Sequence, residues 1–163
     1  MTRIPSYASV VVLTDLSERA ARALPHACAL VATGGTVHLV HVLEVPDVPN
    51  PGYAHYGPTP GTPAEKSRRR REAESELAQA LRVFGAPEGL KIATHVYECG
   101  PTELVERLLE VARELRADLI CIASHGRRGL ARVLLGSVAE GVLRRCDVPT
   151  LVVRVPESER QAD

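Results

Sequence analysis

Five mostly apolar runs are spaced along the chain, and a segment with helix signals lies between each pair. Short apolar runs without polar alternation are typical of strands that are buried on both faces. Alternating strands and helices favour a parallel sheet covered by helices on both sides. The pattern therefore predicts an α/β fold of order β-α-β-α-β-α-β-α-β. The expected strands are Ala8–Leu13, Thr36–Val42, Leu90–Tyr97, Asp118–Ser124 and Pro149–Val155.

The segments between these strands carry recognisable start and stop signals for helices. The first helix is expected over Ser17–Ala32, kinked by Pro25 and ended by Gly34-Gly35. Thr62-Pro63-Ala64-Glu65 combines an N-cap, a proline at the first helical position and a capping-box glutamate. That second helix is predicted to reach Phe84, the third to open at Gly100-Pro101, and the last to span Ser137–Cys146.

Length and composition indicate one domain, over residues 1–156, followed by a flexible tail at 157–163. Proline and glycine recur from Pro46 to Pro63, so residues 46–62 are predicted to form a mobile surface loop. The helix after this loop contains the basic run Arg68–Arg71. We interpret that run as a solvated face, in which Arg68 pairs with Glu72 and Arg70 with Glu74, rather than as an anion site.

Charge and cysteine content exclude several classes of protein. Lysine and arginine number 20, as do aspartate and glutamate, so no overall field favours nucleic acid or an anionic membrane. The four cysteines form no CxxC pair, which argues against a zinc ribbon or a redox dithiol. Neither a secretory leader nor a long apolar span is apparent, and a cytoplasmic location is expected.

The segment Ala123–Val138, which reads ASHGRRGLARVLLGSV, joins an apolar strand to a helix. A glycine-bearing loop at a helix N-terminus favours phosphate, because backbone N–H groups converge there and the helix dipole is positive. The loop is not a Walker A motif, since Gly136 is followed by Ser137-Val138 rather than by lysine. It also lacks the glycine spacing of the dinucleotide fingerprint.

This segment resembles the universal stress proteins. Their nucleotide-binding members carry a glycine, two residues, a glycine, nine residues, and then glycine with serine or threonine. The corresponding residues here are Ala123, Gly126, Gly136 and Ser137. Further resemblance lies in Val-Leu-Thr-Asp-Leu-Ser at 12–17, Leu-Val-His-Val at 39–42, Gly100-Pro101 and Val148-Pro149, so that it extends from about Ala8 to Val155.

The resemblance implies a single five-stranded parallel sheet of order 3-2-1-4-5, with helices on both faces, as in Rossmann-like adenine-nucleotide alpha-hydrolases. It implies ATP, with ADP or AMP as further ligands, and any divalent metal held mainly by the phosphates. Adenine would lie near Leu13, Thr14, Asp15, Val42 and Ile122. The ribose and phosphates would contact Ala123, Gly126, Arg127, Gly136, Ser137 and Val138.

The first motif glycine is replaced by Ala123. An alanine would be strained if this position required positive φ, whereas a small side chain alone would satisfy a strand end. We favour the second interpretation, because a residue that ends a strand normally has negative φ.

Two of the candidate site residues have a second interpretation. Asp15-Leu16-Ser17-Glu18 fits a capping box, so Asp15 is either an N-cap or a ligand for the nucleoside. Ser137 and Glu140 fit the same pattern, so Ser137 either caps its own helix or contacts phosphate. The strand histidines, His38, His41 and His95, show no ligand spacing for a metal along the chain.

No arranged base, nucleophile, P-loop lysine or metal-holding acidic pair is evident, so hydrolysis is expected to be slow if it occurs. Three hypotheses remain: an ATP-binding switch or sensor in the stress response, a dimer that binds protein partners without nucleotide, and a weak ATPase. The resemblance further implies a homodimer through Thr150–Val155, because that strand would be a sheet edge.

Overall fold

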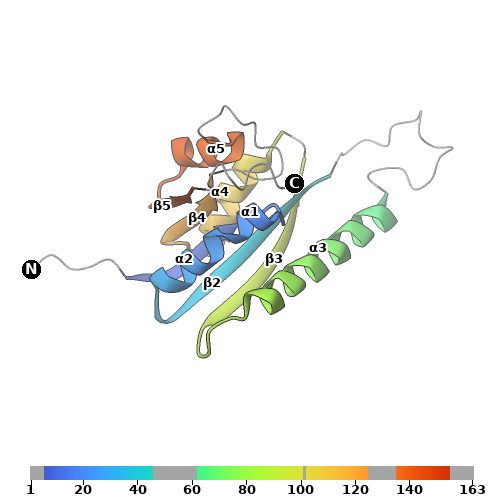
Figure 1. Ribbon diagram of the computed structural model, residues 1–163. Helices are drawn as coiled ribbons and strands as arrows, with labels where there is room; N and C mark the ends of the chain where they lie inside the picture. The colour runs from blue at the N-terminus through green and yellow to red at the C-terminus, as the bar shows by residue number, and fades with distance from the viewer. Residues whose placement is uncertain (1–5, 46–61, 101, 125–134, 155–163) are drawn as a thin grey trace, which may run out of the picture.

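The computed structural model describes residues 6–45, 62–100, 102–124 and 135–154. The predicted loop at 46–62, except for Thr62, and the tail at 157–163 lie outside these residues. Strands and helices alternate as expected (Figure 1). The strands are β1 (Tyr7–Leu13), β2 (Val31–Glu44), β3 (Lys91–Cys99), β4 (Leu119–Ala123) and β5 (Thr150–Val153). The helices are α1 (Glu18–Ala21), α2 (Ala23–Leu30), α3 (Pro63–Phe84), α4 (Leu104–Glu114) and α5 (Ser137–Arg145).

The strands form one sheet of order β3-β2-β1-β4-β5, in which every neighbouring pair is parallel. The predicted fold class and strand order are therefore confirmed. In the central pair, Leu13 of β1 lies opposite Ile122 of β4. On the other side of β1, Leu13 lies opposite Val40 of β2. The two edges of the sheet are β3 and β5.

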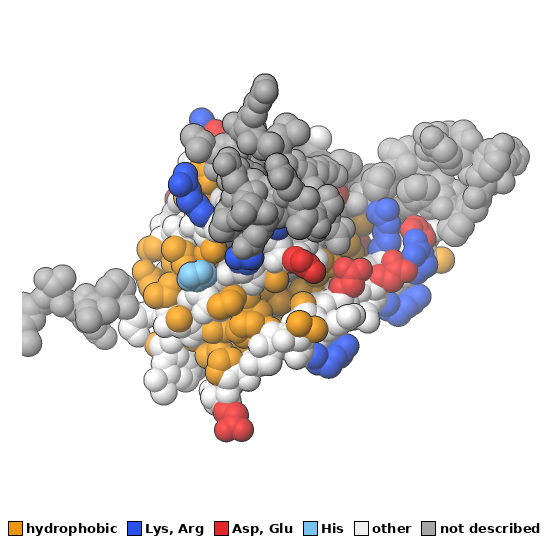
Figure 2. Space-filling view, in the orientation of Figure 1, with side chains coloured by type: hydrophobic (Ala, Val, Ile, Leu, Met, Phe, Trp, Pro, Cys, Tyr) orange, Lys and Arg blue, Asp and Glu red, His pale blue; other side chains and the backbone are white. Residues whose placement is uncertain are grey.

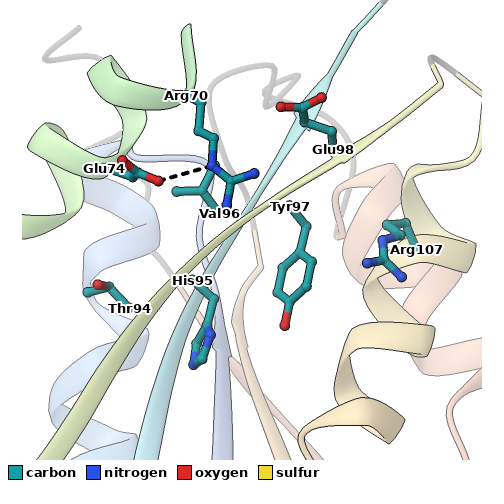
Figure 3. A pocket seen from close by; sticks show the side chains of 8 residues that line it. All are labelled: Arg70, Glu74, Thr94, His95, Val96, Tyr97, Glu98 and Arg107. Atoms are coloured by element: carbon teal, nitrogen blue, oxygen red, sulfur yellow. Dashed lines mark hydrogen bonds and ion pairs between the residues drawn. The ribbon is translucent and has the colours of Figure 1, made fainter. Parts of the chain in front are cut away.

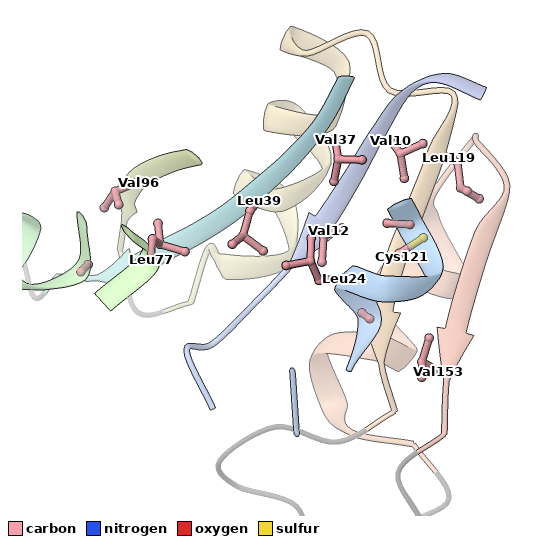
Figure 4. Packing of buried hydrophobic residues seen from close by; sticks show 13 residues of the cluster. Val10, Val12, Leu24, Val37, Leu39, Leu77, Val96, Leu119, Cys121 and Val153 are labelled. Carbon is pink, nitrogen blue, oxygen red and sulfur yellow. The ribbon is translucent and has the colours of Figure 1, made fainter. Parts of the chain in front are cut away.

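Two apolar layers cover the two faces of the sheet. On one face, α2 packs Leu24 against Val12 of β1, and α3 places Leu77 beside Leu39 of β2 and Val96 of β3, as Figure 4 shows. On the other face, α4 and α5 pack Val111 and related side chains against β1, β2 and β4. Because β1 and β4 carry buried side chains on both faces, they read as continuous apolar runs in the sequence.

The first predicted helix is in fact two helices, and it ends earlier than expected. Pro25 has no N–H to donate to the carbonyl of Ala21, and its ring crowds that carbonyl, so the helix breaks at Arg22. The second piece ends at Leu30, and β2 begins at once. The prediction that Gly34-Gly35 ends this helix is therefore wrong.

Gly34 and Gly35 instead lie within β2, at an irregularity in its pairing with β1. Tyr7 lies opposite Val31, but Ser9 lies opposite Thr36, so extra residues of β2 are accommodated between these pairs. Gly34 has φ +81°, and a Cβ at Gly35 would stand 2.7 Å from the carbonyl oxygen of Ala8. Only glycine meets both requirements without strain.

The long helix α3 begins and ends as predicted. The Thr62 hydroxyl accepts a hydrogen bond from the N–H of Glu65, Pro63 occupies the first turn, and Gly85 ends the helix at φ +64°. The predicted pairs of Arg68 with Glu72 and Arg70 with Glu74 are both present. Basic and acidic side chains alternate along α3 on the right of Figure 2, as in a solvated helix face.

Other boundaries differ by a few residues from the predicted ones. Helix α4 begins at Leu104 rather than at Gly100, and the N–H of Glu103, just before the helix, donates to the carbonyl of Gly100. Strand β5 ends at Val153, and β2 and β3 both run beyond their predicted ends. These long strands create the wall of the site described next.

Candidate functional site

At the centre of the sheet, β1 and β4 end before the neighbouring β2 does, and we use the word notch for this step at the strand ends. Strand β1 stops at Leu13 and β4 at Ala123, whereas the neighbouring β2 runs on to Glu44, which lies opposite Cys99 of β3. The longer strands therefore stand as a wall beside the ends of β1 and β4 (Figure 1). Such a place, where connections leave a parallel sheet in opposite directions, is where α/β proteins bind ligands.

One side of the notch is apolar. Leu13, Val42 and Ile122 are 4%, 7% and 6% exposed, and they belong to the cluster beneath α4 and α5. Val138, in the first turn of α5, packs against the same cluster. Four of the candidate residues, which come from four different elements, thus share one hydrophobic environment.

A tight turn after β1 supplies the polar side of the notch. The N–H of Thr14 donates to the carbonyl of Val40, and its hydroxyl accepts from the N–H of Leu16. The Oδ1 atom of Asp15 accepts from the N–H and from the hydroxyl of Ser17, at 3.1 and 2.6 Å. These bonds hold Leu16 at φ +66°, a conformation that few residues other than glycine adopt.

The prediction that Asp15 caps the following helix is wrong by two residues. The N-cap of α1 is Ser17, whose hydroxyl accepts from the N–H of Ala20. Asp15 lies two residues earlier and orients Ser17 instead. Its carboxylate is half-buried at the end of β1, where the resemblance had located a nucleoside contact.

The N-terminus of α5 lies directly beside the end of β4. The N–H of Gly136 donates to the carbonyl of the buried Ser124, and the N–H of Ser124 donates to the carbonyl of Val153. Gly136 is the N-cap of α5, with φ −68° and ψ 153°. The first backbone N–H groups of such a helix have no partners within it.

The capping box predicted at Ser137 is not formed. Ser137 is already the first residue of α5, and the N–H of Glu140 donates to the carbonyl of Gly136. The side chain of Ser137 is exposed at the helix start. Ala123 lies in β4 and is not among the residues with positive φ, so the alanine is not strained there. Gly126 and Arg127 lie outside the described residues.

A second feature, at the β3 edge of the sheet, escaped the sequence interpretation. A groove of about 680 Å³ follows β3 from Thr94 to Glu98 and is flanked by Arg70 and Glu74 of α3 and by Arg107 of α4 (Figure 3). The Arg107 guanidinium lies 4.8 Å from the centre of the Tyr97 ring. The groove is separate from the notch, since β2 lies between β3 and β1.

His38 and His95 meet beside this groove. The Nδ1 atom of His38 lies 3.0 Å from the Nε2 atom of His95, and both rings are partly buried. Burial lowers the pKa of both imidazoles, and the proximity of His95 lowers the pKa of His38 further. Spacing along the chain gave no sign of this pair. A comparison of which face each strand histidine shares would have found it.

Other features of the described residues exclude simpler sites. Within those residues, His, Cys, Asp and Glu side chains form no group of three or more arranged to hold a metal ion. No helix in the described ranges is long and apolar enough to cross a membrane. Cys121 is buried, and burial raises the pKa of its thiol to about 12, so it has no thiolate character at neutral pH.

Comparisons with known proteins agree with the fold. A sequence model of the universal stress protein family matches residues 6–154. Universal stress protein MJ0531 of Methanocaldococcus jannaschii is 36% identical over 107 residues, which are 63% of this chain and 61% of that protein. The chain thus spans less than two thirds of the length of this relative.

Two solved structures extend the similarity to nearly the whole chain. Protein MJ0577 of the same archaeon superposes with a TM-score of 0.71 at 26% identity, covering 93% of this chain and 99% of that one. A universal stress protein in complex with cAMP superposes with a TM-score of 0.55 at 27% identity, covering 91% and 98% of the two chains.

Proposed function

We propose a function for this chain, which belongs to the universal stress protein family. It binds an adenine nucleotide in the notch and acts as a regulatory switch or sensor in the stress response. One observation supports this proposal: the apolar cluster that contains Leu13, Val42 and Ile122 lies next to the N-terminus of α5. An adenine ring requires the first of these features, and a phosphate requires the second.

The apolar residues of the notch are the proposed adenine contacts. Leu13, Val42 and Ile122 belong to one buried cluster, and a flat apolar base gains affinity by covering the edge of such a cluster. Thr14 and Asp15 present backbone and carboxylate groups at the end of β1, where they would recognise the polar edge of the base or the ribose hydroxyls.

The phosphates are proposed to lie at the start of α5. Ala123, Gly126, Arg127, Gly136, Ser137 and Val138 are the proposed contacts for ribose and phosphate. Among the described residues of this set, Gly136 supports the assignment. It is the extended N-cap of α5, and the first N–H groups of the helix beside it can bind an anion. The exposed Ser137 hydroxyl would add a further donor.

The proposed ligand is supported by the family and by one of its solved members. A universal stress protein was crystallised with cAMP, which is an adenine nucleotide. For this chain we propose ATP as the ligand, with ADP or AMP as alternatives and with any divalent metal held mainly by the phosphates. A protein partner would then recognise the surface that the nucleotide stabilises.

We favour a regulatory role over ATP hydrolysis because of the residues around the proposed phosphate position. Among the described residues of the notch we find neither a nucleophile paired with a base nor a cluster that holds a metal. Asp15, which comes nearest to a base, accepts two hydrogen bonds from Ser17 through Oδ1. We therefore expect ATP hydrolysis to be slow, if it occurs.

Calorimetric titration with ATP, ADP, AMP and cyclic AMP tests this proposal directly. Asp15→Asn is a suitable variant, because an amide oxygen can still accept from Ser17 while the negative charge is lost. Changed affinity with an unchanged melting temperature would support contact between Asp15 and the nucleotide. Wild-type protein that binds none of the four nucleotides, and carries none after purification by mass spectrometry, would refute the proposal.

We also propose a homodimer through Thr150–Val155. Strand β5 is an edge of the sheet, and Thr150–Val153 pair with β4 on one side only within the chain. An edge strand of β-branched and apolar residues pairs readily with a second copy of itself.

A further inference from the structure

We propose that His38 and His95 form a two-imidazole site for a divalent transition-metal ion such as Ni²⁺, Cu²⁺ or Zn²⁺. The site is independent of the proposed nucleotide notch. It lies on the face of the sheet that carries α4 and α5, where β2 and β3 pair at the open edge.

The sheet brings the two rings together and holds them. His38 lies opposite Ala93 of β3, and His95 lies opposite Val40 of β2, so the histidines are diagonal neighbours on one face. Backbone pairing along the whole of β3 fixes this relationship. The site is therefore built on two paired strands rather than on a loop, which limits the reorganisation that binding requires.

The separation of the nitrogens suits a shared ion. The Nδ1 atom of His38 and the Nε2 atom of His95 are 3.0 Å apart. With metal–nitrogen bonds of about 2.05 Å, this separation corresponds to an N–metal–N angle of about 95°, within the range of cis ligands in tetragonal and distorted tetrahedral sites. An ion bound to both nitrogens would lie to one side of the N···N line, so each ring would turn to aim its lone pair at the ion.

The protonation state of the pair also favours coordination. Burial lowers the pKa of both rings, so both are neutral at pH 7, the form in which imidazole binds metal. Without metal, one of the two facing nitrogens carries a proton and donates it to the other. On binding, that proton moves to the far nitrogen of its own ring, and both facing lone pairs point to the ion.

The charged surroundings do not repel a cation. Arg107, which lies over Tyr97, is paired with both Glu110 and Glu114, at 3.1 and 2.8 Å. Arg70 is paired with Glu74, and Glu98 lines the same groove. Carboxylates thus outnumber guanidiniums around the groove. Tyr97 stacks beside His95 at a centroid distance of 6.1 Å, and its ring extends in the same direction (Figure 3).

Two protein ligands set the expected affinity and selectivity. Because the described residues provide no third ligand group of this kind nearby, water would fill the remaining coordination positions. Binding should therefore be moderate, and it should favour ions that prefer imidazole over hard ions such as Mg²⁺.

The test is a calorimetric titration of the tag-free full chain with Ni²⁺ at pH 7.5, with Mg²⁺ as the hard-ion control. Wild-type protein should bind Ni²⁺ and not Mg²⁺ at this site. His38→Asn and His95→Asn should each weaken Ni²⁺ binding by roughly tenfold or more, since even outer-shell changes weaken metal sites on that scale. His26→Asn, which alters an exposed histidine of α2, should leave binding unchanged.

Imidazole resonances of the wild type provide a measurement that does not depend on the variants folding. Added Zn²⁺ should shift the ring signals of His38 and His95 together and in proportion. Unchanged signals for this pair, or Ni²⁺ affinity retained within twofold in the double variant, would overturn the proposal. Nucleotide titrations should be unaffected by either variant, which separates this test from that of the notch.

Discussion

The backbone N–H of Gly136 lies 2.8 Å from the carbonyl oxygen of Ser124 and donates a hydrogen bond to it. The chain leaves the sheet at Ser124 and returns at Gly136, so this bond fixes the start of α5 against the end of β4. The positive end of a helix is thereby held beside the apolar notch.

Gly136→Asp should abolish nucleotide binding without unfolding the protein. Gly136 has φ −68° and ψ 153°, which any residue adopts, and aspartate is a favoured N-cap. The new carboxylate would repel the phosphates from the start of α5. Gly136→Asn is the matched control, because it adds similar bulk and caps the helix without charge. Calorimetry should give a much larger loss for Asp than for Asn, and ATP affinity within twofold of wild type in the Asp variant would contradict the phosphate assignment.

Val152→Pro should convert a dimer into a folded monomer. In the parallel ladder the N–H groups of Ile120 and Ser124 donate to the carbonyls of Pro149 and Val153, so the N–H of Val152 points away from β4. Proline there removes an outward donor and no hydrogen bond to β4, although it also replaces the part-buried Val152 side chain. Light scattering coupled to size exclusion measures the mass.

Leu151→Pro provides the contrast for that experiment. The N–H of Leu151 points toward β4, so proline at this position removes a hydrogen bond inside each protomer and should lower the melting temperature. A wild-type protein of monomer mass at tens of micromolar would contradict the proposed dimer.

Asp118→Ala should lower the free energy of unfolding by about 1.5–3 kcal/mol, the range for hydrogen bonds to charged groups. The two carboxylate oxygens of Asp118 accept from the N–H groups of Ala8 and Ser9, at 2.7 and 3.1 Å, and so attach the start of β1 to β4. Asp147→Ala removes an exposed carboxylate whose nearest guanidinium is 3.5 Å away, and it should change stability little. Urea denaturation measures the free energy of unfolding of both variants. An equal decrease in the two would show that the hydrogen bonds between Asp118 and β1 do not stabilise the fold.

Acid should destabilise the fold through His38 and His95 before it acts on the carboxylates. Both histidines have folded pKa values below the ordinary 6.5, so the unfolded chain takes up these protons first. Stability is therefore full above about pH 6.5 and declines as the pH falls toward 5. Glu65 and Glu106, whose pKa values lie below the ordinary 4.5, lose their contribution only at lower pH.

Denaturation at a series of pH values tests this order. The decline between pH 6.5 and 5 should be shallower in a His38→Asn, His95→Asn double variant than in wild type, whereas His26→Asn should behave as wild type. A double variant with the wild-type slope would show that other groups govern this range.

Much of the fold follows from short stretches of sequence. The apolar runs predicted the strands. Thr62-Pro63 and Gly85 marked the two ends of α3, because helix caps depend on hydrogen bonds made within a few residues. The break at Arg22 was signalled by Pro25, although its extent was underestimated. Gly34-Gly35 misled the interpretation because a glycine pair after an apolar stripe serves a helix end and a strand irregularity equally well.

The sequence by itself determined the alternation of strands and helices, the family and the glycine-bearing segment that leads into α5. The tertiary structure decided which distant residues meet: Ser124 with Gly136, Asp118 with Ala8, and His38 with His95. Those meetings depend on strand register, where a shift of one residue turns every side chain to the other face. Register is set by the packing of the whole sheet, and no short stretch of sequence contains it.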